Sequence, residues 1–584
     1  MTTIFARDRF TSISSLQPLL SADAEVHNDD DDGNYDDDGR HDTRQAPKAV
    51  PELGLPVNQK RRFWWQKSAA PDPDAIATQP SVFDDPDTAE KYYPPAEWEN
   101  VHRFDPLFRW TWGDEARLIR KIDFCIMAWA CIMFMALELD RSNLVQALTD
   151  NFLVDLDYNL GNTIFKLSFM CSELPSQLIS KWMGPDRWIP LQMVLWSVVA
   201  LCQFWLAGRT GFLFSRSLLG ILQGGFIADV VLYLSYFYKH SELTIRLSFF
   251  WMAISVADIC SALLAYGLLH MRGVGGLPGW RWLFLIEGFL TFIVGLLATL
   301  LMPPGPCQTA SWFRGRHGWF NEKEEKIIVN RVLREDPTKS SMHNREAITP
   351  ALLWKCLKDY DLWPLYLIGL TYAVPMAPQS QYITLSLKAL GFTTFQCNLL
   401  TIPHTILHII NMMLLTYAAE WRNELTFTAI VGEVWAIPFL VYFYLADTTT
   451  AEANRWVVYI VTTLLLGYPN PHPIQVGWNS RNSNSVRLRT VSAALYNMMV
   501  QAGGVVSSNI YREDDAPHYQ RAHRLLLLIA CANLVTYTLT KVYYQWRNAT
   551  RDARWAAMNE DERMDYLTNT TDDGNKRLDF RFAH

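Results

Sequence analysis

Ionisable side chains occur inside long apolar stretches of this sequence, where they could bind an ion or carry a proton. Fourteen uncharged residues, 124–137, lead directly to Glu138, Asp140 and Arg141. The next apolar stretch contains Lys166 and Glu173, which are seven positions apart and therefore share a helical face. Later stretches contain Arg216, Asp229, Asp258, Glu287 and Glu433. A charge at mid-bilayer costs roughly 2.5–3.5 kcal/mol on insertion scales, so such residues normally face a partner or a water-filled path.

The elements that must position these residues are apolar blocks of about 20 residues, near the length of a membrane-spanning helix. Half of the 584 residues are apolar, and only 19 % are charged, below the roughly 25 % of soluble domains. We therefore predict an all-α membrane protein with twelve transmembrane helices in two six-helix bundles. The expected spans are 121–140, 160–180, 189–207, 212–236, 247–270, 281–302, 361–384, 394–417, 425–446, 456–478, 488–510 and 522–546.

The polar segments between and around these spans define the expected domains. Residues 1–115 are acidic and rich in proline, and are expected to be a disordered cytosolic region. The bundles should cover 116–302 and 361–546. A cytosolic loop, 303–360, would join them and carry a surface helix around "NEKEEKIIVNRVLRED", and 547–584 would be a cytosolic tail.

The orientation rests on the Lys and Arg residues of the loops. The loops expected inside contain 18 of them against 7 outside, or 8 against 7 without the long central loop. The basic segments at both ends of the membrane region agree with cytosolic termini. The chain is expected in the plasma membrane.

Other chemistries lack their sequence signatures. Neither GxxxxGK[ST] nor HExxH occurs, and the nine Cys form no CxxC. His404 and His408 are four residues apart and could share a metal, but no third ligand is evident and packing is the simpler interpretation. We therefore predict no enzyme activity, no metal and no cofactor.

Several short strings resemble a known family when they are taken in order. They are "LDRSNLVQA", "FMCSELPSQLISKWMGPDRW", "SRSLLGILQGGF", "GWRWLFLIEG", "WNSRNSNSVRLRT" and "NIYREDDAP", within 117–547. The arrangement of six plus six spans resembles the major facilitator superfamily. The strings resemble the fungal allantoate-permease group of its anion:cation symporters.

This resemblance implies a secondary transporter that works by alternating access around a site near the bilayer midplane. The group's substrates include allantoate, ureidosuccinate, nicotinate, pantothenate, biotin and sulfur oxyanions, mostly taken up with protons. The sequence departs from the pattern at Gln223, where related symporters have a carboxylate linked to proton sensing. Asp229 stands where glycine is common, and Lys166 and Asp258 occupy positions expected to be uncharged.

The predicted site follows from these charges and motifs. Lys166 and Arg216 would attract an anion, because Coulomb attraction is stronger in a low dielectric than in water. The full substrate-binding set is Arg216, Lys166, Asn143, Asn479, Asn482 and Gln223. The proton carriers would be among Glu173, Asp258, Asp229 and Asp140, and the gating residues are Arg141, Asp186, Arg187 and Arg481.

Purely structural or interfacial roles remain open for several of these residues. Asp140 and Arg141 could lie at a helix end in the membrane interface, where long side chains reach water at little cost. Lys166 and Glu173 could be a structural pair, Arg216 an interfacial anchor, and Glu287 a structural residue.

The leading functional prediction is proton-coupled uptake of a small organic or sulfur-containing anion in a fungus. The expected partners are that anion, a proton gradient and the lipid bilayer, with no nucleic acid, and the chain would act as a monomer. Export of a secondary metabolite is one alternative. A nutrient sensor that binds without transport is another, because the acidic N-terminal region could serve signalling. A membrane enzyme is the weakest alternative.

Overall fold

The computed structural model describes most of the chain beyond residue 70. The acidic run near the start and parts of several loops lie outside the described residues. The described residues are 52–54, 71–84, 89, 92–96, 98–147, 158–335, 337, 354, 357–422, 424–446, 454–483, 486–515, 518–570, 572 and 574–584.

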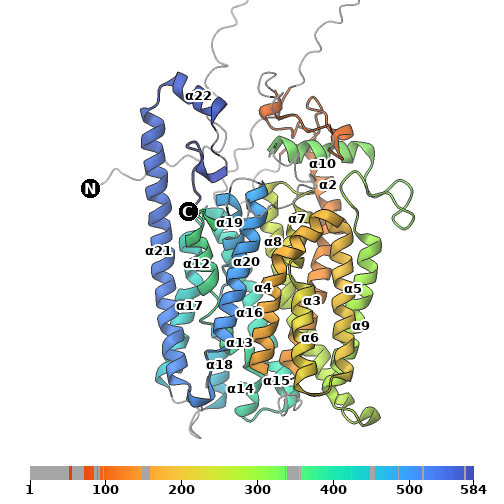
Figure 1. Ribbon diagram of the computed structural model, residues 1–584, viewed down its shortest axis with the longest axis vertical. Helices are drawn as coiled ribbons and strands as arrows, with labels where there is room; N and C mark the ends of the chain where they lie inside the picture. Colours follow the sequence, from red (N-terminus) through yellow and green to blue (C-terminus); the bar gives the residue numbers. More distant parts are fainter. Residues whose placement is uncertain are drawn as a thin grey trace, which may run out of the picture. The chain divides into compact units, whose positions relative to one another are not determined.

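Two groups of helices, which we call the N-half and the C-half, form the described chain (Figure 1). The N-half contains α2 (Trp112–Ile122), α3 (Ala128–Ala147), α4 (Tyr158–Met183), α5 (Pro185–Cys202), α6 (Gly208–Gln223), α7 (Phe226–Leu234), α8 (His240–Leu268) and α9 (Gly279–Leu301). A π-helical turn, Asp123–Met127, joins α2 to α3. The helix α10 (Glu322–Glu335) follows the N-half.

The C-half contains α12 (Trp363–Thr371), α13 (Ala377–Gln381), α14 (Ile383–Ala389), α15 (Thr394–Leu400), α16 (Ile402–Arg422), α17 (Thr426–Leu445), α18 (Arg455–Leu466), α19 (His472–Ser483), α20 (Val486–Ser508), α21 (Gln520–Ala557) and α22 (Glu560–Asn569). Short 3-10 helices cover Val82–Asp84, Val101–Arg103, Gln203–Trp205, Leu269–Met271, Val274–Gly276, Glu513–Asp515 and Gly574–Lys576. Below, "the α10 end" means the end of the helices near α10 and α22, and "the α14 end" means the opposite one (Figure 1).

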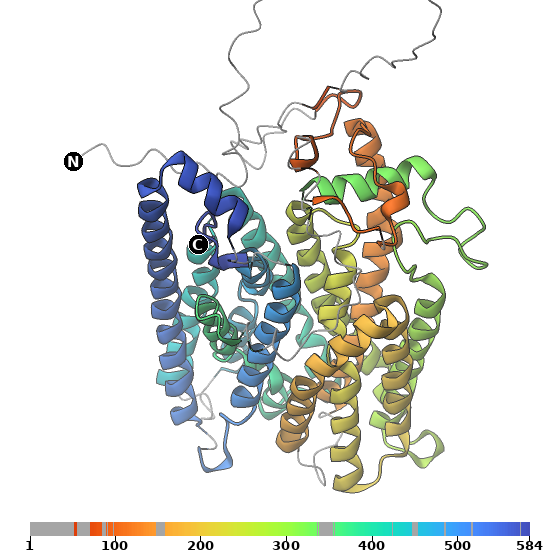
Figure 2. The same cartoon turned by 45° about the horizontal axis from the view of Figure 1, so that its top comes forward.

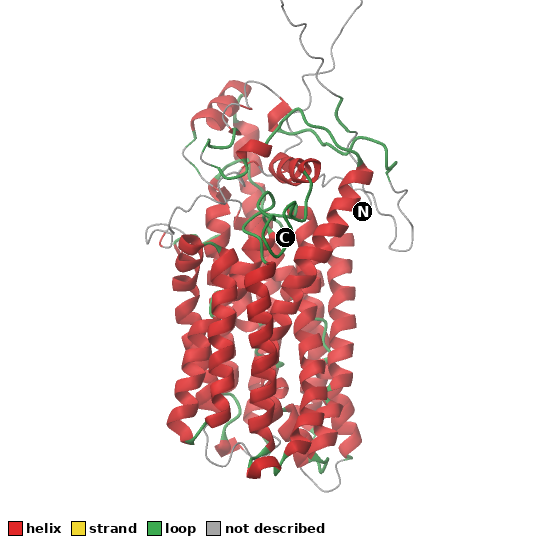
Figure 3. Cartoon of the chain, turned by 90° about the vertical axis from the view of Figure 1, so that its right-hand side faces the viewer, coloured by secondary structure: helices red, strands yellow, loops and turns green. Residues whose placement is uncertain are grey.

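The all-helical fold predicted from the apolar blocks is confirmed, since every expected span falls on one helix or on consecutive helices. Within the described residues there is no strand, only two isolated bridge pairs (Figure 3). Eight helical stretches among these residues are long and apolar enough to cross a membrane. The other expected spans are the polar helices α4 and α20 and the two interrupted runs α12–α14 and α18–α19.

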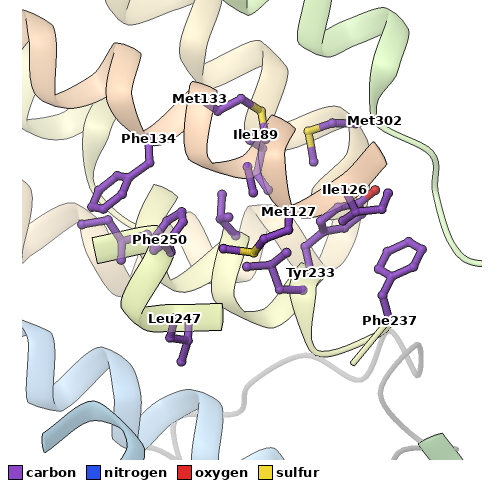
Figure 4. Packing of buried hydrophobic residues seen from close by; sticks show 14 of the residues in the cluster. Ile126, Met127, Met133, Phe134, Ile189, Tyr233, Phe237, Leu247, Phe250 and Met302 are labelled. Atoms are coloured by element: carbon purple, nitrogen blue, oxygen red, sulfur yellow. The ribbon is translucent and has the colours of Figure 1, made fainter. Parts of the chain in front are cut away.

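Apolar side chains fill the interior of each half. In the N-half, Phe134 of α3 stacks on Phe250 of α8 with ring centroids 4.1 Å apart, and Met127 and Tyr233 belong to the same core (Figure 4). In the C-half, Trp478 of α19 belongs to a separate buried cluster with residues of α12, α20 and α21. Met412 of α16 belongs to the N-half cluster and Val476 of α19 packs against both clusters, so the two halves are in direct apolar contact.

The helix α10 is confirmed, but the segment before α2 covers it. The Arg103 guanidinium donates to Glu325 with an Nε–Oε2 distance of 2.9 Å, and Asn330 exchanges hydrogen bonds with the backbone of Arg103 and Asp105. Burial raises the pKa of Glu325, although Arg103 opposes the shift. Residues 98–115 are thus ordered, in contrast to the disorder expected up to residue 115, because their aromatic and polar side chains find partners on α10.

The C-terminal tail docks on the α10 end of the C-half (Figure 2). The carbonyl of Ala583 accepts hydrogen bonds from Trp478 and Asn482, at 2.7 and 3.2 Å. Nearby, Lys576 contacts Asp359 at 2.6 Å. Burial alone would lower the pKa of Lys576, but hydrogen bonding and the charge of Asp359 outweigh it and raise that pKa above its usual value.

Close packing of α4 against α6 depends on the absence of a side chain at Gly220. A Cβ there would lie 2.4 Å from the carbonyl oxygen of Phe165 and 2.9 Å from the Cβ of Ser168. We expect Gly220→Ala to destabilise the protein by about 1–3 kcal/mol, the usual cost of overpacking. The midpoint of thermal unfolding in detergent measures this loss.

The matched control is Gly211→Ala on the same helix, where the nearest atom to an added Cβ is 3.7 Å away. Because alanine favours helix more than glycine does, this variant should be as stable as the wild type or more stable. Equal midpoints for the two variants would contradict the packing argument.

Candidate functional site

Lys166 and Glu173 both reach from α4 to α20, across the boundary between the halves. The Lys166 ammonium donates to the Gly504 carbonyl at 2.7 Å and to the Ser508 hydroxyl at 2.8 Å. The Glu173 carboxylate accepts a hydrogen bond from the Asn497 amide at 2.8 Å. The seven-residue spacing thus places both charges at the face where the halves meet.

Two arginines of the N-half contact the same aromatic ring of α4. The guanidinium carbons of Arg216 and Arg141 lie 4.6 Å and 5.5 Å from the centroid of Phe165. Arg216 is buried and interacts electrostatically with Lys166. Two arginines, from α6 and α3, therefore contact Phe165, and Lys166 of α4 interacts with one of them.

Arg141 is held by polar partners on two helices. Its Nη1 donates to Glu138 at 2.7 Å, and its Nε donates to Gln223 at 3.0 Å. Within the described residues, its buried Nη2 has no hydrogen-bond partner. Asp258 of α8 interacts electrostatically with Glu138, so this carboxylate borders the same cluster. Arg141 thus lies inside the N-half rather than at an exposed helix end.

A break between α6 and α7 lies beside these residues. Gly225 has a φ of 84°, in the left-handed region that favours glycine. Side-chain amides satisfy the backbone at the break: Gln177 donates to the Gly225 carbonyl at 3.2 Å, and Gln192 donates to the Gly224 carbonyl at 3.0 Å. Asp229 follows on α7, is fully buried, and interacts electrostatically with Glu173.

A second break interrupts the corresponding span of the C-half. The residues between α18 and α19 are 467–471, and Asn411 of α16 donates to the Gly467 carbonyl at 2.6 Å. Counted from the first helix of each half, both breaks fall in the fourth expected span. Interrupted helices at corresponding positions of two repeats are typical of transporter binding sites.

Asp140 and Asn143 lie apart from the α20 face. Asp140 accepts a hydrogen bond from Thr291 of α9 at 3.4 Å, and Asn143 interacts with Glu287 on the same helix. All four residues are buried between α3 and α9. They form a second polar cluster inside the N-half.

The three predicted residues of α19 are not brought to the face between the halves. Asn479 accepts a hydrogen bond from Ser492 at 2.9 Å, and Asn482 bonds the docked tail. Arg481 pairs with Glu420 at 2.9 Å. Each has a partner within the C-half, near the α10 end.

The predicted latch of Asp186 and Arg187 is weak in this structure. The Arg187 side chain is 78 % exposed, and its Nε is 4.0 Å from Asp186, at the limit of an ion pair. Exposed pairs of this kind contribute little. Asp186 itself interacts electrostatically with Arg314, in the segment after α9.

A buried aromatic cluster around His472 of the C-half was not predicted from the sequence. The His472 ring nitrogen Nδ1 is 3.0 Å from the Tyr372 hydroxyl and 3.3 Å from the Tyr496 hydroxyl. Trp251 of α8, from the N-half, meets the His472 ring edge to face at 4.4 Å between centroids. His472 lies within the proline-rich string "GYPNPHP", 467–473, which gives no sign of these partners.

Comparison with known proteins agrees with the fold. Residues 126–508 match the family model described as Major Facilitator Superfamily. The chain is 44 % identical over 527 residues to an uncharacterized transporter of Saccharomyces cerevisiae, which covers 89 % of this chain and 96 % of that protein. It is 28 % identical over 443 residues to the MFS-type transporter efuF of Hormonema carpetanum. This alignment covers 74 % of this chain and 86 % of that protein.

Among solved structures, the chain resembles a partially occluded inward-open form of the xylose transporter XylE from E. coli. The TM-score is 0.50 at 13 % identity, over 73 % of this chain and 97 % of that one. At this identity the likeness shows the fold alone. The chain belongs to the Major Facilitator Superfamily and is a membrane transporter rather than an enzyme.

Proposed function

We propose that this transporter is a proton-coupled symporter that takes up a small organic or sulfur-containing anion by alternating access. The observation that carries the proposal is a group of three cations, in which Arg141 and Arg216 contact the Phe165 ring and Lys166 interacts electrostatically with Arg216. Arg141 is paired with Glu138, whereas the like charges of Lys166 and Arg216 repel each other, and burying like charges together is unfavourable. An anion bound beside Lys166 and Arg216 would reduce that repulsion.

The contacts of Lys166 suggest how anion binding would reach the second half. The ammonium donates to Gly504 and Ser508 of α20, so it ties the two halves together. An anion that accepts from the same ammonium competes with these two oxygens. Binding therefore changes the contact between α4 and α20, which is the kind of differential contact that alternating access needs.

The substrate class rests on the same charges together with the resemblance to the allantoate-permease group. Arg141 has a buried Nη2 that can donate to an oxyanion, and a guanidinium matches the geometry of a carboxylate. In this proposal the α10 end is cytosolic, the chain lies in the plasma membrane, and one chain suffices for transport. Of the predicted substrate residues, Lys166, Arg216 and Gln223 remain in the proposed site.

The test is uptake of radiolabelled allantoate, ureidosuccinate, nicotinate and sulfonates by cells that lack their own carriers. We expect Arg216→Ala to weaken uptake by roughly 30- to 5,000-fold, because truncating one member of a buried charge interaction costs about 2–5 kcal/mol. The matched control is Arg117→Ala, an arginine whose side chain is 72 % exposed. Undiminished, proton-dependent uptake by Arg216→Ala would remove Arg216 from the mechanism.

A further inference from the structure

Two carboxylates lie side by side inside the N-half, away from the face that meets α20. Asp140 of α3 is 2 % exposed and Glu287 of α9 is fully buried. They are seven and eight residues from the helix termini at the α14 end, or about 11 Å at 1.5 Å per residue. The two carboxylates interact electrostatically with each other. The pair is therefore well inside the membrane-spanning part of the helices.

Uncharged side chains surround the pair. Thr291 of α9, one helical turn after Glu287, donates its hydroxyl to Asp140 at 3.4 Å. Trp196 of α5 also interacts with Asp140, and the fully buried Asn143 interacts with Glu287. None of these neighbours carries a charge that could offset an ionised carboxylate.

The electrostatic cost of two buried charges also favours one bound proton. A buried carboxylate is costly when ionised, and a second one beside it raises the cost further. In the described part of the chain, neither Asp140 nor Glu287 takes part in an ion pair. A proton held between the two removes one charge and lets one carboxyl donate a hydrogen bond to the other.

We propose that Asp140 and Glu287 together hold one exchangeable proton and form the coupling-ion site of this transporter. The proposal rests on the proposed proton-coupled transport and assigns its proton carrier. Of the four carriers suggested by the sequence, it selects Asp140 and adds Glu287 as its partner. Glu173, Asp229 and Asp258 keep structural or electrostatic roles beside the cationic group.

A proton fits this cluster better than a metal ion does. Calcium takes six to eight oxygen ligands and magnesium takes six. The side chains here are Asp140, Glu287, Asn143 and Thr291, and no group of three or more His, Cys, Asp or Glu that could hold a metal occurs among the described residues.

The charged groups on neighbouring helices connect the pair to the anion site. On α3, Glu138 and Arg141 pair with each other, and Asp258 of α8 interacts with Glu138. At the far ends of neighbouring helices lie Arg281 of α9, which donates to the Leu206 carbonyl, and Asp186 with Arg187 of α5. Because Asp140 and Arg141 are consecutive residues of α3, a displacement of this helix on proton loss would also move the arginine of the anion site.

Infrared spectroscopy of the purified full-length protein tests the proposal without a substrate. A protonated carboxyl has a carbonyl stretch that an ionised carboxylate lacks. We expect one such band, lost with rising pH in the wild type, to be absent from Asp140→Asn/Glu287→Gln. Each single variant should keep a band whose loss occurs at a different pH, because its remaining acid no longer has a charged neighbour.

The matched control is Glu433→Gln, which replaces a buried carboxylate of the C-half that is bonded to Asn533. This variant should keep the band assigned to the pair. An unchanged carboxyl spectrum in the double variant would overturn the proposal. A spectrum of the wild type that responds to sodium in place of choline at constant ionic strength would also overturn it, in favour of a metal cation.

Transport measurements separate the assignment of the proton site from the proposed function, anion uptake. In proteoliposomes, the Asp140→Asn variant should lose accumulation driven by a pH gradient, yet still exchange radiolabelled allantoate, ureidosuccinate or nicotinate. Full accumulation by this variant would refute the pair as the coupling site while leaving anion transport intact. If the wild type transports none of these anions, the proposed function fails, and the infrared result still decides whether the pair holds a proton.

Discussion

Lys166→Ala should reduce the apparent affinity for a transported anion by roughly 30- to 5,000-fold, because the loss of one buried cationic partner costs about 2–5 kcal/mol. The substitution also removes both hydrogen bonds from the ammonium to α20. Concentration-dependent uptake in cells expressing the variant measures the loss as a raised KM.

The control for Lys166 is Ser508→Ala, which removes one hydrogen bond to the ammonium and leaves the charge in place. A hydrogen bond to a charged group contributes about 1.5–3 kcal/mol, and the Gly504 carbonyl still accepts from the ammonium, so the KM should change by at most roughly 10- to 150-fold. If Ser508→Ala and Lys166→Ala had equal effects, the tie between α4 and α20 would explain the result, and Lys166 would not be an anion-binding group.

Arg331→Ala should destabilise the protein by about 3–5 kcal/mol, because removing one partner of a buried ion pair leaves an uncompensated charge. The Arg331 side chain of α10 is fully buried and pairs with Glu242 of α8 and, at 3.6 Å, with Glu115 of α2. Glu115 also accepts from Lys239 at 2.5 Å. Thermal unfolding in detergent should show a marked fall in the midpoint.

Lys326→Ala on the same helix is the matched control for Arg331. Its ammonium is 3.9 Å from Glu322, whose side chain is 66 % exposed, so the pair is screened by water. The control should change stability by less than about 1 kcal/mol. A similarly small effect of Arg331→Ala would contradict the interpretation of α10 as a structural part of the N-half.

The sequence predicted the spans and the inward charges because both depend on local properties. Twenty apolar residues must cross the membrane as a helix, and a spacing of seven places Lys166 and Glu173 on one face. That face packs against another helix rather than lipid, since ionisable groups are too costly in the acyl chains. This reasoning holds for each helix without knowledge of its neighbours.

The remaining features depend on contacts between distant segments, which no local pattern encodes. The string "WNSRNSNSVRLRT" indicated polar residues near a helix end, but not that Asn482 would bond the tail more than a hundred positions later. The carboxylate of Glu287 lies on α9, and only the packing of α9 against α3 reveals Asp140 beside it. Segment 98–115 was expected to be disordered, but it is ordered because its partners are on α10.

The paired interruptions between α6 and α7 and between α18 and α19 have a mechanical consequence. An intact helix resists bending through its ladder of backbone hydrogen bonds, whereas these two spans have that ladder interrupted, with side-chain amides bonding freed carbonyls. Each span can therefore flex at one point along its length. The parts of these spans at the α10 end, α7 and α19, can therefore change direction without a matching movement of α6 and α18 on the other side of the two joints.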